Sequence, residues 1–337
     1  MHKVLHTPTR TLNAQDYKTL SLSALGGALE FYDFIIEVPG AWTFVSEHVP
    51  KNKIGLACGI LTSGLSLGIL LGSLVSTAMN KCLSSEQLID WGWRIPFIVG
   101  GVFGLIAMYL RRWLKETPIF LEMQNRKQQE LAKKIPVLTV LTGYLPQTIL
   151  SMLLTWVLSA GIMVIMLMTP ILLQKQFGYS AIDALQGNIL AIIGLIISCT
   201  FYGMMMDKFA MGKVMLIGCV IATIVIAIFY LSLDNPHLLF ITYSLAGFSV
   251  GIVGSFAYFM VRVFPTQIRY SGVSFSFNMA YAIAGGLTPL LISFLSDFVS
   301  KMAPAIYVIG LFGFGALIGL YLFIKDNSQK YIAKDIA

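Results

Sequence analysis

The run "IGLACGILTSGLSLGILLGSLVSTA" at residues 54–78 contains no charged residue. A helix needs about 20 mostly apolar residues to cross the hydrocarbon core of a bilayer, and this run is long enough. Similar apolar runs predict seven further spanning helices, at residues 94–113, 140–172, 181–205, 214–233, 237–261, 271–296 and 303–324. We therefore expect an all-α polytopic membrane protein.

The composition favours the same class. Hydrophobic residues make up 57% of the 337 residues, charged residues only 12%, and the mean hydropathy is +0.79. A soluble domain carries about 25% charged residues. The chain has no Walker-type phosphate loop, no metal-ligand spacing among its four cysteines and four histidines, and no Ser-His-Asp pattern. We expect neither an enzyme nor a bound cofactor or metal.

The positive charge follows the predicted topology. When successive loops are assigned to alternate sides of the membrane, all but four of the 23 Lys and Arg residues fall on one side, the exceptions being Lys81, Arg94, Lys175 and Lys301. Cytoplasmic loops carry such an excess. The net charge of +7 thus indicates orientation, with both termini cytoplasmic, and not a nucleic-acid partner.

A long basic loop divides the chain. We predict a truncated amino-terminal helical bundle at residues 1–110, a cytoplasmic linker at 111–136, and a six-helix bundle with a cytoplasmic tail at 137–337. A weak internal repeat relates the two halves, because "AWTFVSEHVPKNKIG" around Pro50 aligns with "AYFMVRVFPTQIRYSG" around Pro265. In the first half, little chain precedes the repeat. This length deficit predicts a junction near Ile36–Glu37 with on the order of 90 residues absent.

Several motifs resemble the metabolite:proton symporters of the major facilitator superfamily, which include proline/betaine, 2-oxoglutarate, shikimate and citrate transporters. They are "GALEFYDF" (27–34), "EVPGAWTFVSEHVPKNKIG" (37–55), "WGWRIPF" (91–97), "RRWLKETPIF" (111–120) and "FPTQIRYSGVSFSFN" (264–278). The resemblance implies a pair of six-helix bundles, with a complete second bundle and a first bundle that lacks helices two, three and the start of four. It also implies an acid where this chain has Arg262.

The junction makes the topology of residues 19–50 unusual. With a cytoplasmic start and with Lys51 and Lys53 also cytoplasmic, about 32 residues are too few for two full spans. We predict a strained hairpin or a re-entrant pair of half-helices, broken near Glu37–Gly40. One long helix with an inverted end is the alternative.

Three acids precede or adjoin the junction. Glu30, Asp33 and Glu37 follow the spacing i, i+3 and i+7, which places them on one helix face. Acids inside a membrane are costly and are functional by default, so we interpret them as proton-coupling candidates. Packing or interfacial roles are the alternative for all three.

The short loop "GMMMDKFAMGK" contains Gly203, Asp207, Lys208 and Lys213. On its own it could be an ordinary positively charged loop. The resemblance implies a cytoplasmic gate that latches the ends of the bundles.

The candidates for a substrate cavity are Tyr32, Asn278 and Tyr281. The last two lie on the predicted helix 271–296, in which Gly285, Gly286 and Pro289 mark a point where a transporter helix can break. Satisfied helix contacts would explain Asn278 and Tyr281 equally well.

The resemblance implies a secondary active transporter in the bacterial inner membrane. It would carry a small polar metabolite, an organic acid or a zwitterionic osmolyte, by proton symport, and the proton gradient would be its energy source. We expect a monomer whose transport is impaired by the truncation. The alternative is a non-transporting, membrane-embedded remnant or binding module.

Overall fold

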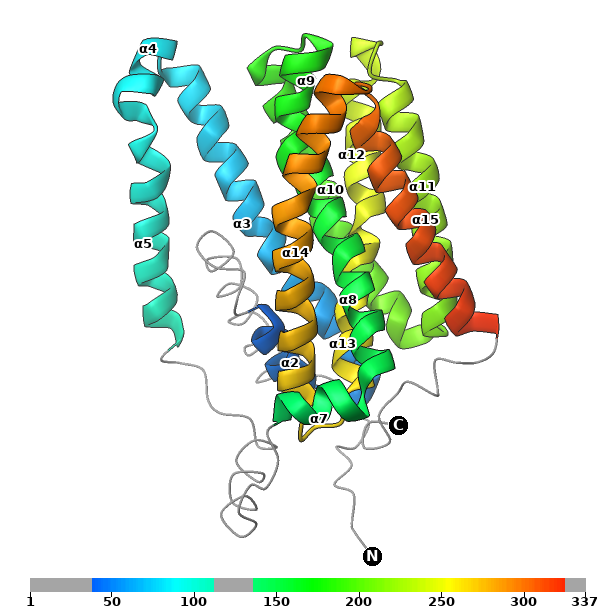
Figure 1. Cartoon of the computed structure of the whole chain (residues 1–337). Coiled ribbons are helices and arrows are strands. Elements are labelled where there is room, and N and C mark those ends of the chain that lie inside the picture. Colours follow the sequence, from blue (N-terminus) through cyan, green and yellow to red (C-terminus); the bar gives the residue numbers. More distant parts are fainter. Residues whose placement is uncertain (1–37, 112–135, 325–337) are drawn as a thin grey trace, which may run out of the picture.

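The computed structural model describes residues 38–111 and 136–324, and these residues form a bundle of long helices (Figure 1). Eight of its helical segments are long and apolar enough to cross a membrane, and they match the eight spans expected from the sequence. Two lie before residue 111 and six lie after residue 136. The described residues therefore agree with an incomplete first bundle and a six-helix second bundle.

The first half begins with a short helix. Its elements are α2 (Val38–His48), η2 (Lys51–Lys53), α3 (Ile54–Cys82), α4 (Ser85–Gln87), η3 (Leu88–Gly92) and α5 (Arg94–Arg111). With 11 residues, α2 is about 16 Å long and cannot cross a core of about 30 Å. Pro39 and Gly40 lie in its first turn, where the missing proline N–H costs no hydrogen bond. The described helix is continuous from Val38 to His48, and Glu37 with the chain before it lies outside the described residues, so the break near Glu37–Gly40 stays a prediction.

The second half contains six spans. Its elements are α7 (Pro136–Gly143), α8 (Leu145–Ala160), η4 (Gly161–Met168), α9 (Thr169–Phe177), α10 (Ala181–Lys208), α11 (Met211–Leu231), η5 (Pro236–Leu238), α12 (Leu239–Val250), η6 (Gly251–Val253), α13 (Gly254–Val263), α14 (Arg269–Phe298) and α15 (Ala303–Ile324). The segments α8, η4 and α9 form one span, as do η5 to α13. Ser180 caps α10 by accepting a hydrogen bond from Asp183 N at 3.0 Å.

The predicted repeat has a structural counterpart. In each half a short helix ends just before a proline, Pro50 or Pro265, and a long helix follows after a turn. The pairs pack crosswise, with α2 against α14 and α13 against α3. Trp42 and Phe277 meet edge to face in the first of these contacts, with ring centroids 5.2 Å apart.

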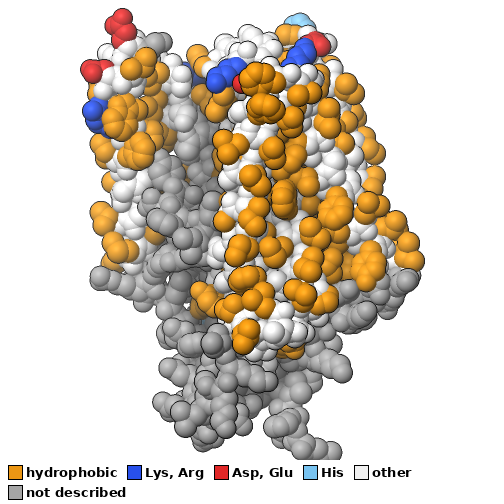
Figure 2. Space-filling model, viewed as in Figure 1, with side chains coloured by type: hydrophobic (Ala, Val, Ile, Leu, Met, Phe, Trp, Pro, Cys, Tyr) orange, Lys and Arg blue, Asp and Glu red, His pale blue; other side chains and the backbone are white. Residues whose placement is uncertain are grey.

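The charged residues mark the two ends of the bundle. We call the end with Lys51, Lys53, Lys208, Lys213, Arg262 and Arg269 the basic end, and the other the opposite end. In the face shown in Figure 2, apolar side chains cover the middle of the helices, and the charged side chains in view gather at the opposite end. This distribution suits helices that face lipid along their middle.

The helices of the first half are unequally enclosed. In its most apolar stretch the span containing α3 is 72% buried, because α3 packs along α10 and α13. The span containing α5 is only 17% buried, and α5 stands beside α3 at one side of the molecule (Figure 1). Thus α3 connects the first half to the second.

Candidate functional site

At the basic end, an acid of α10 holds the start of α3. The carboxylate of Asp207 accepts hydrogen bonds from Gly55 N at 2.7 Å and from Leu56 N at 2.8 Å. The first amides of a helix have no partner within the helix, and the helix dipole favours a negative charge there. Lys53 and Arg262 lie within electrostatic reach of the same carboxylate. Asp207 is therefore a clamp between the two halves.

Glycines allow the two helices to meet at this clamp. A Cβ atom on Gly203 would overlap the carbonyl oxygen of Gly55, and one on Gly59 would lie 2.6 Å from the carbonyl oxygen of Cys199. Such contacts require residues without side chains. Above the clamp, Ser63 Oγ donates to Ile196 O at 2.7 Å. The crossing of α3 and α10 thus closes the basic end on this side.

A buried ion pair joins α2 to α14 where these two helices cross. Arg269 Nη1 lies 3.0 Å from Glu47 Oε1, and the two side chains are only 5% and 9% exposed. Arg269 Nη2 also donates to Thr266 Oγ1 at 3.0 Å. At the position corresponding to Glu47 in the other half, the guanidinium of Arg262 lies over the ring of Tyr258 and donates to its hydroxyl.

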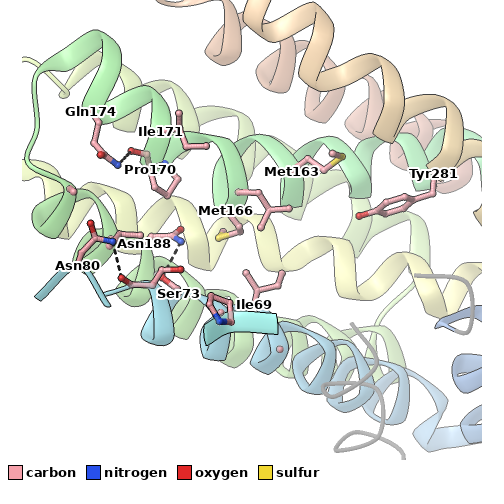
Figure 3. Close-up of a pocket in the computed structure, with 17 residues that line it drawn as sticks. Ile69, Ser73, Asn80, Met163, Met166, Pro170, Ile171, Gln174, Asn188 and Tyr281 are labelled. Carbon is pink, nitrogen blue, oxygen red and sulfur yellow. Dashed lines mark hydrogen bonds between the residues drawn. The ribbon is translucent and has the colours of Figure 1, made fainter. Parts of the chain in front are cut away.

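A cavity of about 600 Å³ lies farther along the bundle (Figure 3). It extends from Tyr281 to Asn80 and Gln174, which lie near the ends of α3 and α9 at the opposite end of the bundle. Its described lining is mostly apolar, and its polar side chains are uncharged: Ser73, Ser76, Asn80, Gln174, Asn188 and Tyr281. These side chains can form hydrogen bonds with a polar solute, and none of them carries a full charge that would need an ionic partner in the solute.

One polar contact in the cavity wall joins the two halves. Asn188 Nδ2 of α10 donates to Ser73 Oγ of α3 at 3.4 Å, and Figure 3 shows the two side chains pointing toward each other. The asparagine oxygen accepts from the Tyr243 hydroxyl at 2.8 Å. That hydroxyl also lies 2.6 Å from the carbonyl oxygen of Ile165 in η4. The cavity wall is thus connected to the backbone of the neighbouring span.

This span has irregular backbone. The segment η4 is a π-helix of eight residues between α8 and α9, and Met163, Met166 and Leu167 line the cavity from it. π-Helical turns are rare and occur frequently at functional sites. By contrast, α14 is one continuous helix through Gly285, Gly286 and Pro289.

The structure separates the residues singled out from the sequence. Gly203 and Asp207 lie in the clamp, whereas Lys208 and Lys213 are exposed at the basic end. Tyr281 lines the cavity, but Asn278, half-buried one turn earlier, is not among its lining residues. Glu30, Tyr32, Asp33 and Glu37 lie outside the described residues, so their roles stay predictions.

Several site residues were not anticipated. Glu47 and Arg269 stand in the quoted motifs, but one sequence carries no signal that pairs positions 222 apart. Ser73, Asn188 and Tyr243 are polar residues in apolar spans, but each of these spans holds other polar residues, so the sequence does not single them out. The only local hint of the π-helix is Pro170 inside the predicted span 140–172.

Comparison with known proteins gives separate evidence on the family of this chain. The family model described as Major Facilitator Superfamily matches residues 36–289. The inner membrane metabolite transport protein YhjE of Escherichia coli (strain K12) is 30% identical over 308 residues, covering 86% of this chain and 67% of that protein. The proline/betaine transporter of the same strain is 30% identical over 307 residues, covering 87% of this chain and 60% of that protein. Both relatives are named as transport proteins.

The solved structures show the fold. The proton:xylose symporter XylE, bound to 6-bromo-6-deoxy-D-glucose, has a TM-score of 0.66 at 15% identity, covering 92% of this chain and 79% of that one. FucP in an outward conformation has a TM-score of 0.61 at 15% identity, covering 91% and 82%. The chain spans about two thirds or less of the two sequence relatives, which is consistent with the predicted internal deletion. It is an integral membrane protein that belongs to the Major Facilitator Superfamily, with relatives among the metabolite transporters.

Proposed function

We propose that this chain is a secondary active transporter of the proton-coupled type, and that its solute is small, polar and without net charge. The observation that carries the proposal is a solute-sized cavity between the halves, beyond a basic end that is closed by Asp207 and by the Glu47–Arg269 pair. Alternating access needs two halves that rock about a shared site. The described arrangement is one of the two states that such a cycle requires.

Orientation follows from charge. The positive-inside rule places the basic end in the cytoplasm of a bacterial cell, within its inner membrane. The cavity then reaches toward the outside through Asn80 and Gln174. In this state the protein would receive its solute from outside, with the cytoplasmic path shut.

The lining favours a zwitterion over an organic acid. Burying an unpaired charge is expensive, and the described lining offers amides and hydroxyls but no cation to pair with a dicarboxylate. The proline/betaine transporter and the glycine betaine/proline/ectoine/pipecolic acid transporter OusA of Dickeya dadantii (strain 3937) among the relatives support the same class. The energy source is the proton gradient, with Glu30, Asp33 and Glu37 as the proton-coupling candidates, and no cofactor is needed. The protein acts as a monomer.

The chain by itself is expected to transport poorly, because it spans only 67% of YhjE and 60% of the proline/betaine transporter of E. coli. The alternative is a membrane-embedded binding module that takes up a solute without moving it. Purified protein in proteoliposomes, given radiolabelled L-proline, glycine betaine or succinate, separates these possibilities. Binding of the zwitterions with weak uptake that a protonophore abolishes supports an impaired symporter. Binding with no uptake supports the module, and binding of succinate alone overturns the solute class.

A further inference from the structure

Pro170 removes the backbone donor that the π register of η4 would give to Ile165 O. At its end Thr169 N donates to Val164 O, which is the i→i−5 register of a π-helix. In this register the next donor would be residue 170 and its acceptor would be Ile165 O. Residue 170 is proline and has no N–H. Ile165 O must therefore find its donor elsewhere.

Tyr243 of α12 supplies that donor. Its hydroxyl lies 2.6 Å from Ile165 O, and its side chain is completely buried. A buried carbonyl without a donor is costly, so this hydrogen bond supports the π register from a neighbouring helix. The preceding carbonyl, Val164 O, also receives a side-chain hydrogen bond, because the Thr169 hydroxyl donates to it at 2.7 Å.

The same hydroxyl has a second acceptor. Asn188 Oδ1 lies 2.8 Å from it, yet a tyrosine hydroxyl has only one proton to donate. Ile165 O and Asn188 Oδ1 therefore compete for that proton. If the asparagine amide turns over, its NH₂ group donates to the tyrosine oxygen, and the proton is left entirely to Ile165 O.

The other edge of the Asn188 amide faces the cavity. Its Nδ2 atom donates to Ser73 Oγ at 3.4 Å, which is a long and weak hydrogen bond. A solute in the cavity can replace this contact. Asn188 is only 4% exposed, so its side chain has little room to move. Its amide can respond to a solute chiefly by turning over, which exchanges the positions of the oxygen and the NH₂ group.

We propose that Asn188 is a positioning residue that transmits occupation of the cavity to the π-helix η4 through Tyr243. The inference rests on the transport function proposed above. A solute that donates a hydrogen bond favours the turned amide, because Asn188 Oδ1 then faces the cavity. The Tyr243 proton then goes to Ile165 O and η4 becomes more stable. A solute that only accepts hydrogen bonds keeps the amide as described and leaves the proton shared.

Variants without solute test the connection first. Hydrogen exchange of residues 160–170, followed by mass spectrometry on the full chain in nanodiscs, reports local opening of η4. Tyr243→Phe removes the donor and should accelerate this exchange about fivefold to tenfold. Asn188→Leu keeps the approximate volume but removes the competing acceptor, so it should slow the exchange. In the double variant the exchange should match that of Tyr243→Phe alone.

Two further variants serve as controls. Tyr202→Phe removes a hydroxyl from a buried tyrosine of α10 closer to the basic end, and it should leave residues 160–170 unchanged. Ser73→Ala frees the cavity edge of the amide and should alter the exchange only while Asn188 and Tyr243 are both present. Acceleration by both Asn188→Leu and Tyr243→Phe, in an additive manner, would overturn the proposal, as would no response to Tyr243→Phe.

Matched solutes test the direction of the signal. L-Proline carries N–H donors, whereas its N,N-dimethyl derivative and glycine betaine carry only acceptors. Binding is measured separately by thermal shift. L-Proline should slow exchange in residues 160–170 and the two methylated solutes should not, and Asn188→Leu should abolish the difference. If none of the three binds, the proposed solute class fails, while the variants without solute still decide the role of Asn188. Equal slowing by all bound solutes refutes the proposed transmission.

Discussion

Arg269 at the start of α14 and Glu47 near the end of α2 form a buried ion pair, with 3.0 Å between Nη1 and Oε1. The two residues belong to different halves of the molecule. Opening the basic end must separate them, so this pair opposes opening together with the Asp207 clamp. In a transport cycle these contacts set how easily the solute path reaches the cytoplasm.

Removing one partner of this pair should destabilise the protein strongly. Glu47→Gln breaks a buried ion pair by removing the carboxylate charge 3.0 Å from Arg269 Nη1, which costs about 3–5 kcal/mol. Arg269→Met should cost a similar amount, and the double variant much less than the sum. Thermal unfolding in detergent measures each loss. Asp234→Asn is the control, because the Lys301–Asp234 pair is 49% and 77% exposed and should contribute about 0–1 kcal/mol. Additive losses in the double variant would show that the two charges do not depend on each other.

The Asp207 clamp should control access to a native cysteine. Cys58 on α3 is fully buried and lies within electrostatic reach of Asp207. Asp207→Asn replaces one acceptor oxygen by an NH₂ group that faces a backbone N–H, so the clamp weakens by about 1–2 kcal/mol. Maleimide labelling of Cys58, resolved by mass spectrometry, should become about tenfold faster, while Cys219 on α11 stays unlabelled. Asp183→Asn, at the other end of α10, should leave Cys58 protected, and equal labelling in both variants would contradict the role of the clamp.

The glycine contact at the clamp should tolerate no side chain. Gly203→Ala places a methyl group against the carbonyl oxygen of Gly55, so α3 and α10 must separate. We expect a lower unfolding temperature together with faster labelling of Cys58. Gly286→Ala in α14 is a matched control, because nothing lies within 4 Å of the added methyl group. That substitution should be neutral or stabilising by up to about 1 kcal/mol. A Gly203→Ala protein as stable as Gly286→Ala would disprove the close contact.

The sequence was informative where the membrane leaves few choices. Lipid provides no hydrogen-bond partners, so apolar runs must be helices, and the eight predicted spans were confirmed. The short loop with Asp207 could be predicted from its motif. The partners of Asp207 could not, because Gly55 and Leu56 lie about 150 positions earlier and only the packing brings them together.

Residues within a span are harder to assign than the span itself. Asn278 and Tyr281 are three positions apart on α14, yet only Tyr281 lines the cavity. Their exposure depends on how α14 is rotated against its neighbours, which no single sequence specifies. The π register of η4 likewise depends on a hydroxyl from α12, so local sequence could not predict it.

Because Tyr281 lines the cavity and Asn278 does not, the two residues give a direct test of the cavity. Tyr281→Phe removes a hydroxyl from the lining and should weaken binding of L-proline or glycine betaine about twofold to tenfold, which corresponds to the loss of one hydrogen bond. Asn278→Ala should leave the affinity unchanged. Isothermal titration in detergent measures both constants. The opposite result, with loss of binding in Asn278→Ala alone, would place the solute site elsewhere.

The last prediction concerns the missing part of the first bundle. Two rocking halves need complete walls around the site, and this chain spans 60% of the proline/betaine transporter of E. coli. We expect the 337-residue chain to insert and fold with little proton-coupled uptake. Inserting helices two to early four of that relative between Ile36 and Glu37 should restore uptake of L-proline in proteoliposomes.

An unrelated membrane segment of equal length at the same point is the control, because added length alone should restore nothing. Uptake by the chimera should stop when a protonophore collapses the gradient. If the unmodified chain concentrates L-proline strongly and loses this ability with the protonophore, the absent segment is dispensable and the described residues suffice to form both access states. If neither protein transports while the chimera still binds the solute, what is missing lies outside helices two to four.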